Sequence, residues 1–102
     1  MFYQIKSLSV KEGTSTKVVE RFSGEGLIEK QPGFIDLKVL VKKVRRGDEE
    51  VIVMIQWESE ADWKNWEKSP EHIAGHKASA GKPRPDHILE SSQHVYEVKA
   101  SK

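Results

Sequence analysis

The chain has 102 residues, a formal net charge of +1, 36% hydrophobic and 32% charged residues, and no cysteine. This length is typical of one domain with a modest core. A hydrophobic core this small often gains stability from a ligand or a second subunit. The balanced charge argues against a global field that attracts nucleic acid or membranes. The absence of cysteine excludes disulfides, thiolate metal sites and cysteine nucleophiles.

The first predicted element is a strand over Phe2–Val10. Its apolar side chains change parity between Ile5 and Leu8, so we expect either a bulge near Lys6 and Ser7 or burial on both faces. The segment lacks the basic flank and long apolar run of a signal peptide, and no window of the sequence is long enough to span a bilayer. We therefore expect a cytoplasmic protein.

A first helix is predicted after a turn at "KEGTS". Thr14 or Ser15 can cap this helix, because both side chains offer a hydroxyl oxygen to free backbone N–H groups. Val18, Val19 and Phe22 then form an apolar stripe at helical spacing. The glycines of "SGEG" end the helix, and "LIEKQPG" predicts a short further turn of helix and a loop.

Two strands joined by a tight turn follow. In the first, from Phe34 to Val44, alternation predicts that one face carries Ile35, Leu37, Val39 and Val41. The segment "RRGDEE" is typical of a hairpin turn. The second strand, Val51–Trp57, places its odd-numbered residues on one face, and the other face also carries apolar residues.

A second helical region and a last strand complete the predicted elements. Ser59 and Asp62 resemble a capping box that opens a helix through Trp66. Ser69 and Pro70 suit the cap and first position of a further helix. A polar loop, "ASAGKPRPDH", then leads to a final strand at "HVYEVK".

The predicted order, β-α-β-β-α-β, is typical of the ferredoxin-like α+β fold, in which two helices cover one face of an antiparallel sheet. We expect one domain over residues 1–102. The uncovered face would expose apolar side chains at Leu40, Ile52, Met54 and Tyr96. A contiguous patch of this kind indicates a partner, and a two-fold homodimer with packed sheet faces would cover it.

Two tryptophans and two histidines are concentrated in the segment "WKNWEKSPEHIAGH". Trp63 and Trp66, three residues apart, are more often core residues than pocket residues. His72 and His76, four residues apart, share a helix face and could hold zinc. A zinc site is nevertheless disfavoured, because Ile73 stands where a metalloprotease motif has its glutamate and the sequence offers no clear third ligand.

The order of Trp66, Ser69, Pro70 and His76 within a β-α-β-β-α-β chain resembles the Isd-type heme-degrading monooxygenases of Gram-positive bacteria, and their bacillus-type branch in particular. These enzymes belong to the antibiotic-biosynthesis-monooxygenase-like group of dimeric α+β barrels. The similarity extends over "LSVKEGTSTKVVERF", "PGFIDLKVL" and "KPRPDHILE", and so over nearly the whole chain. The part of this similarity that is most specific to the family is the spacing between Trp66 and His76.

The resemblance implies a homodimeric enzyme that uses heme as both substrate and cofactor. His76 matches the histidine that ligates the heme iron, and Gly75 beside it would let a flat ring approach the helix closely. Trp66 matches the tryptophan that presses on the porphyrin and distorts it, and Phe22 matches an aromatic residue that lines the pocket. The implied reaction is reductive, oxygen-dependent cleavage of the porphyrin with release of iron. An external electron donor would supply the electrons.

Two residues depart from the pattern of the family. Lys6 occupies the position of an asparagine that donates a hydrogen bond on the oxygen side of heme. Lysine also donates, but it adds a full charge on a flexible stem, and it could instead reach a heme propionate. His72 replaces a phenylalanine that lines the ring, and it could neighbour heme or face solvent. Arg21 is expected to be a surface residue.

Three alternatives remain open from the sequence. The same pocket could serve a cofactor-free monooxygenase of polyphenols, with His76 as a base or hydrogen-bond donor. The chain could bind or buffer heme without degrading it, because Lys6 replaces the expected asparagine. It could also be a dimeric module without a ligand.

Overall fold

The computed structural model describes the backbone of residues 1–79 and 85–102 and the side chains of residues 1–74 and 85–102. Within these ranges the order of elements confirms the predicted β-α-β-β-α-β arrangement, with the second helical region divided in two. The elements are β1 (Phe2–Val10), α1 (Ser15–Ser23), the 3-10 helix η1 (Ile28–Lys30), β2 (Phe34–Val41), β3 (Glu49–Trp57), α2 (Glu60–Lys68), α3 (Pro70–Ser79) and β4 (Ile88–Glu97).

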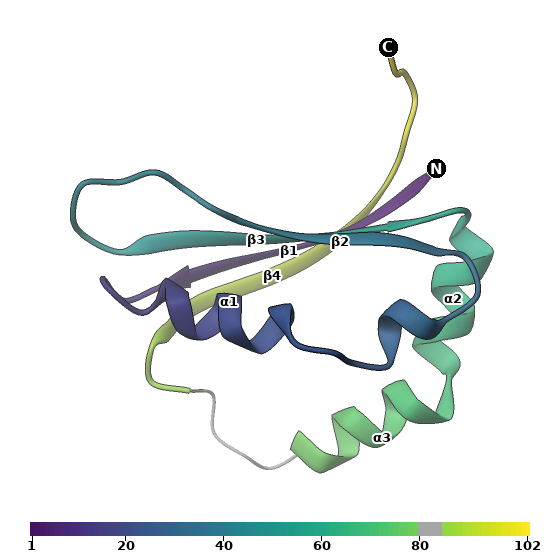
Figure 1. Cartoon of the computed structure of the whole chain (residues 1–102), viewed down its shortest axis with the longest axis horizontal. Helices are drawn as coiled ribbons and strands as arrows, with labels where there is room; N and C mark the ends of the chain where they lie inside the picture. The colour runs from purple at the N-terminus through teal and green to yellow at the C-terminus, as the bar shows by residue number, and fades with distance from the viewer. Residues whose placement is uncertain (80–84) are drawn as a thin grey trace.

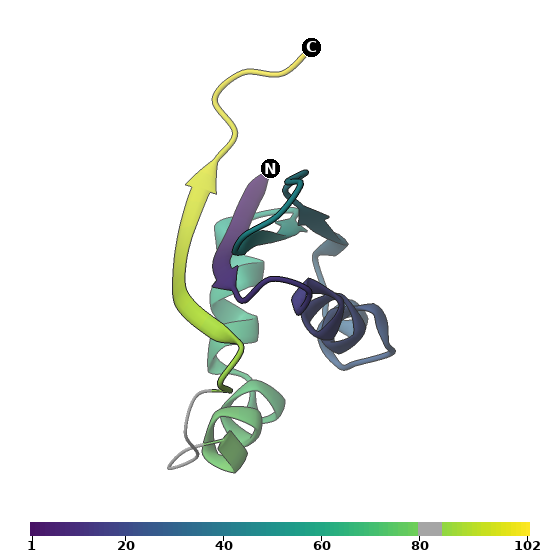
Figure 2. The same cartoon turned by 90° about the vertical axis from the view of Figure 1, so that its left-hand side faces the viewer.

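The strands form one antiparallel sheet in the order β2-β3-β1-β4. This is the strand order of a split βαβ unit, so the predicted ferredoxin-like α+β class is confirmed. The helices lie on one face of the sheet, and α3 continues from α2 away from the strands (Figure 1). Strand β4 forms an outer edge beside β1 (Figure 2). Each helix in the described ranges is too short to cross a membrane.

Strand β1 is regular where the sequence led us to expect a bulge. It keeps one continuous register with β3 along its whole length, so the predicted bulge near Lys6 and Ser7 is wrong. The irregularity lies between Ser9 and Val10, where β1 pairs with β4. The second alternative, apolar residues on both faces, describes the strand. Because side chains alternate, Lys6 lies on the helix-covered face together with Phe2.

Strand β2 contains a bulge that its alternating sequence concealed. The register with β3 shifts between Phe34 and Asp36, which leaves Ile35 as the extra residue. Phe34 therefore joins Leu37 and Val39 on the covered face, and Ile35 is exposed. The prediction that Ile35 shares a face with Leu37 is wrong, because one inserted residue inverts the parity of everything before it.

The hairpin and the last strand differ from prediction only in their limits. Strand β2 ends at Val41 and not at Val44, and the connection turns through Gly47 with a φ of 94°. A positive φ of this size favours glycine, as the hairpin signal predicted. Strand β4 begins at Ile88, earlier than the predicted start at His94. The polar loop before it includes residues 80–84, which lie outside the described residues.

The core lies between the sheet and the helices, in two adjoining clusters. Trp57, fully buried at the end of β3, anchors the first cluster, and Val10 anchors the second. Trp63 and Trp66 of α2 pack against the first cluster, while Phe22 of α1 packs against both. Complete burial of an apolar side chain is worth about 1.5–3 kcal/mol, so even the partial burial of these three side chains helps to hold α1 and α2 over the sheet. The buried members are Phe2, Val10, Val18, Val51, Val53, Ile55, Trp57 and Ile88.

Local hydrogen bonds confirm two of the predicted helix caps and correct the third. Ser59 Oγ accepts from the backbone N–H of Asp62 at 3.2 Å, and Ser69 Oγ accepts from that of His72 at the same distance. Thr14 and Ser15 do not cap α1 with their own side chains. The Glu49 carboxylate of β3 accepts from the Ser15 backbone N–H at 3.1 Å and from its hydroxyl at 2.9 Å.

The loop that leads into β2 depends on a glycine. Gly33 has a φ of +82°, and a Cβ atom there would collide with the Asp62 side chain. Its carbonyl also accepts from the Glu58 backbone N–H at 2.8 Å. Glycine is therefore required for both the conformation and the space, and it allows the loop to close against the start of α2.

Candidate functional site

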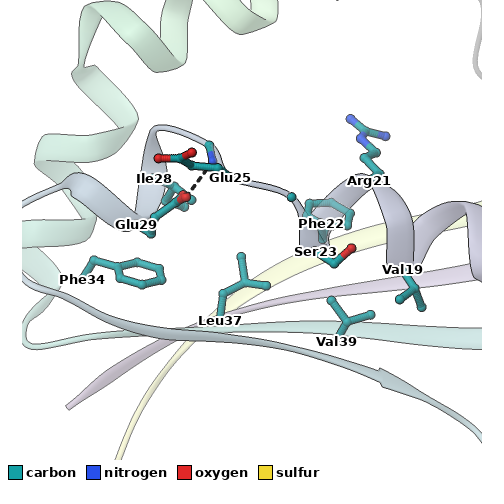
Figure 3. A pocket seen from close by; sticks show the side chains of 12 residues that line it. Val19, Arg21, Phe22, Ser23, Glu25, Ile28, Glu29, Phe34, Leu37 and Val39 are labelled. Carbon is teal, nitrogen blue, oxygen red and sulfur yellow. Dashed lines mark hydrogen bonds between the residues drawn. The ribbon is translucent and has the colours of Figure 1, made fainter.

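Two cavities lie on the helix-covered side of the sheet, and Phe22 lines both. The larger, about 540 Å³, lies between α1, η1 and β2, with Phe34, Leu37 and Val39 directed into it from the strand (Figure 3). Its rim is held by Glu29, which accepts a hydrogen bond from the backbone N–H of residue 26 at 2.6 Å (Figure 3). The smaller, about 420 Å³, is bounded by β1, α1 and β4. Both volumes are in the range of small-molecule sites.

The smaller cavity carries two cations against an aromatic ring. Lys6 Nζ lies 5.7 Å from the centre of the Phe22 ring, and the Arg21 guanidinium carbon lies 5.4 Å from it. Burial lowers the pKa of Lys6 from its ordinary value, and the Arg21 charge lowers it further, while the charge of Glu67 raises it. The wall can therefore attract an anionic group or a ring with a negative face.

The α2–α3 corner brings a second pair of predicted residues together. The ring centroids of Trp66 and His72 are 4.9 Å apart, with an angle of 51° between the planes. Ser69 shapes this corner, because its hydroxyl donates to the Trp66 carbonyl at 2.7 Å and accepts from the His72 backbone N–H. The cap that ends one helix and begins the next thus sets the position of the imidazole.

Glu67 is a residue of this corner that the sequence reasoning missed. His72 Nδ1 lies 3.1 Å from the Glu67 carbonyl oxygen and 3.4 Å from Glu67 Oε2. The other carboxylate oxygen, Oε1, is buried without a hydrogen-bond partner among the described residues. A signal was present in the sequence, because Trp63, Trp66 and Glu67 have the i, i+3, i+4 spacing of one helix face.

The structure brings the expected site residues together in two groups. Lys6 and Phe22 line one cavity, and Trp66 contacts His72 while packing against the same cluster as Phe22. Trp66 is not among the described residues that line either cavity.

Other predictions for the site have mixed outcomes. Gly75 and His76 lie on α3, but their side chains fall outside the described residues. Trp63 packs on Phe2 with ring centroids 5.4 Å apart, which confirms its expected place in the core. Arg21 is exposed, as expected, and it also lines both cavities.

Comparison with known proteins agrees with this architecture. The profile of the antibiotic biosynthesis monooxygenase (ABM) family matches residues 1–78. Over all 102 residues the chain is 61% identical to the heme-degrading monooxygenase HmoA of Bacillus subtilis (strain 168), with 94% of that protein covered.

Two solved structures are similar over nearly the whole chain. A Bacillus cereus protein described by the same family name has a TM-score of 0.87 and 64% identity, over 99% of this chain and 93% of the other. The heme degrader MhuD of Mycobacterium tuberculosis, with two hemes in its active site, has a TM-score of 0.71 and 25% identity, over 100% and 99% of the two chains. The chain therefore belongs to the antibiotic biosynthesis monooxygenase family.

Proposed function

We propose that this protein is a heme-degrading monooxygenase, which cleaves the porphyrin ring with dioxygen and an external reductant and releases the iron. The observation that carries the proposal is the 61% identity, over the entire chain, with a protein of that activity. The aligned region includes every helix and strand that surrounds the two cavities.

The residues around Phe22 fit a flat apolar ring with acidic groups at its edge. Phe22, Leu8 and Ile88 offer apolar contacts, and Lys6 and Arg21 offer two cations within one cavity. Apolar side chains favour the transfer of such a ring out of water, and cations pair with carboxylates at its rim. The wall therefore has the mixture of groups that heme requires.

In this proposal His76 on α3 would hold the iron, since neutral imidazole is a common ligand of heme iron. Gly75 leaves room beside it for the approach of the ring. Heme, when bound, supplies the iron that activates dioxygen and the ring carbon that is oxidised. Trp66 is held by the core and by His72, so its indole would offer a stiff surface to a bound ring.

Lys6 and His72 supply the polar groups of the proposed pocket. Lys6 extends from β1, on the face that the helices cover, and can donate a hydrogen bond into the cavity that it lines. His72 has a side chain only 17% exposed, so its imidazole faces protein more than solvent. In this proposal Lys6 would donate on the oxygen side of the ring, which leaves Arg21 to pair with its carboxylates, and His72 would lie near its edge.

The active unit in this proposal is a homodimer. On the uncovered face of the sheet, Leu40 is 47% and Tyr96 50% exposed, and Ile5, Ile52 and Met54 lie between them in the strand registers. A contiguous apolar patch of this kind is typical of a surface that binds a partner. A second copy packed face to face would cover it with a self-complementary surface.

Hemin titration of the purified protein tests the proposal. We expect a Soret band at one heme per protomer that is lost in His76→Ala. His94→Ala is the matched control, since His94 lies on the sheet face opposite the cavities, and it should retain the band. Because His94 pairs with Ile5 in the proposed interface, sedimentation equilibrium should first show that the control keeps the mass of the parent. Addition of ascorbate in air with catalase should then cause the band to decay while a ferrous chelator captures the released iron.

Each other outcome corresponds to a different function. A Soret band that persists with ascorbate would indicate heme storage without degradation. If hemin leaves the spectrum unchanged, heme is not the substrate, and a cofactor-free oxidation of polyphenols or a ligand-free module would remain. Mass spectrometry of the product identifies the ring position that is cleaved.

A further inference from the structure

The larger cavity has no ligand in the proposed function, which places heme against the residues of the smaller one. Its volume of about 540 Å³ is within the range of small-molecule sites. The covered face of β2 forms its floor, and α1 and η1 form its other walls (Figure 3). The apolar side chains that line it are Val19, Phe22, Ile28, Phe34, Leu37 and Val39.

The bulge in β2 gives this cavity an aromatic floor that is already in place without a ligand. Because Ile35 is the extra residue, Phe34 joins Leu37 on the covered face. The Phe34 ring meets the Trp57 ring edge-on, with centroids 5.8 Å apart and an angle of 89° between the planes. Trp57 is fully buried, so it holds Phe34 in position. A preformed surface of this kind binds a ligand with little loss of side-chain freedom.

The charged side chains at the rim differ in what they can offer a ligand. Glu29 accepts a hydrogen bond from the Gly26 backbone N–H at 2.6 Å, and Glu25 pairs with Lys30 at 3.3 Å. Arg21 has no ion pair among the described residues, and it extends from α1 on the side away from β2 (Figure 3). The acidic groups are therefore engaged within the protein, while the guanidinium can pair with a ligand.

We propose that the larger cavity binds a small apolar carboxylic acid, with its hydrocarbon part between Phe22 and Phe34 and its carboxylate paired with Arg21. The apolar walls favour transfer of the hydrocarbon out of water. A guanidinium matches the planar, two-oxygen geometry of a carboxylate. A neutral ligand would leave the guanidinium unpaired, and a basic ligand would be repelled by it. The inference goes beyond the proposed function, because binding of the acid does not require heme.

This second site has a consequence for heme, since Arg21 and Phe22 line both cavities. In the proposed function Arg21 pairs with the carboxylates of heme. An acid in the larger cavity would compete for the same guanidinium, so each ligand should weaken the binding of the other. Coupling between two sites is reciprocal, and the factor should be the same in both directions. This consequence rests on the proposed function, whereas the second site itself does not.

Titration of the protein with 2-naphthoate, followed by NMR of its methyl groups, tests the site. We expect saturable shifts at Ile28, Leu37 and Val39, which line the cavity, and none at Ile52 on the uncovered face of the sheet. The neutral probe 2-naphthamide has the same rings and a similar shape. It should bind about tenfold more weakly, because it lacks the charge-assisted pair with the guanidinium.

Substitution of Arg21 tests the source of the charge preference. Arg21→Gln should weaken 2-naphthoate by about tenfold and leave the affinity for 2-naphthamide close to that of the parent. Lys17→Gln is the matched control. It removes the same charge from an exposed position on α1 that is not among the residues lining either cavity, and it should leave both affinities unchanged.

Filling the cavity tests the location. Leu37 points into the cavity, so Leu37→Trp should occupy the space and abolish binding of both probes (Figure 3). Ile35→Trp adds a side chain of the same size at an exposed position of β2 and should retain both. If Leu37→Trp does not fold, the methyl shifts of the parent protein decide the location.

Several results would overturn the inference. They are the absence of saturable shifts in the parent, equal affinity for the two probes, or an equal loss in either control variant. With hemin bound, 2-naphthoate should still bind, but more weakly. Its complete exclusion by one equivalent of hemin would also overturn the inference, because heme itself would then fill the larger cavity.

The site and the proposed function can fail separately. Binding of 2-naphthoate to a protein that ignores hemin would retain the second site and remove the heme assignment. Heme degradation by a protein that does not bind 2-naphthoate would retain the proposed function and remove the second site.

Discussion

At the scale of single residues, Trp66 belongs to the core and to the candidate site at once. Its indole packs against the cluster around Trp57 and contacts the His72 ring at 4.9 Å between centroids. The sequence presented these two roles as alternatives, with the core the commoner one. A side chain held on one side by the core offers a stiff surface on the other, so one role supports the other.

Trp66→Phe is expected to retain hemin affinity and to slow degradation. The smaller ring keeps the apolar contact but exerts less pressure on a bound porphyrin. The rate of Soret decay with ascorbate measures the effect, and the Kd for hemin measures binding. Trp63→Phe is the matched control, because Trp63 packs on Phe2 in the core and should affect unfolding more than rate. Equal decay rates for Trp66→Phe and the parent would contradict a role in distortion.

Part of the candidate site was expected from the family resemblance of the sequence. Lys6 and Phe22 were expected near a ligand, and both line the smaller cavity. Arg21 was expected only at the surface, because charged residues on a helix are usually solvated, and it is exposed but also lines this cavity. Glu67 was not expected at the site, and it lies beside His72 at the α2–α3 corner. Their positions depend on which way each helix turns its faces, and that is decided by core residues such as Val18 and Trp63.

At the scale of elements, α1 is capped by another element of the fold. Glu49 of β3 receives hydrogen bonds from the backbone and side chain of Ser15, which is 34 residues away. These bonds lower the pKa of Glu49. These hydrogen bonds tie the start of α1 to β3, an inner strand of the sheet. Helix α1 in turn carries Phe22 and Arg21 to the cavities.

Glu49→Gln is expected to lower the melting temperature at pH 7 and to weaken its dependence on acid. A carboxylate with a depressed folded pKa contributes stability that is fully present above its unfolded value of 4.5 and is lost as pH falls through the folded pKa. Thermal unfolding followed by circular dichroism at a series of pH values measures both effects.

The control for this variant is Glu20→Gln, which removes the same charge from an exposed position on α1. It should leave the acid dependence of the melting temperature close to that of the parent. A parent protein whose melting temperature is constant from pH 7 to well below 4.5 would show that the cap contributes little.

At the scale of the whole molecule, the two faces of the sheet have separate tasks. One face, covered by helices, holds the core and both cavities. None of the described helices lies on the other face (Figure 1). That face presents apolar side chains such as Leu40 and Tyr96 to solvent. Since the cavities lie on the covered face, an interface on the bare face leaves them accessible.

Leu40→Asp is expected to convert a dimer into a folded monomer. Leu40 is 47% exposed in the single chain, so the substitution should cost the protomer little while it places a charge in the proposed interface. Sedimentation equilibrium measures the mass. Leu27→Asp is the control, because Leu27 is 52% exposed but lies next to η1 and away from the bare face. A monomeric parent, or a Leu40→Asp variant that remains dimeric, would argue against this interface.

The sequence by itself determined the order of the elements, the hairpin at Gly47, the caps at Ser59 and Ser69, and the buried face of β3. These features depend on the spacing of residues within short stretches of the sequence, so they can be predicted without the tertiary structure. Only the tertiary structure decided the bulge at Ile35 and the cap that Glu49 places on α1. The bulge follows from pairing between strands, and the cap from a contact between residues 34 positions apart in the chain. Such through-space contacts leave no periodic trace in the chain.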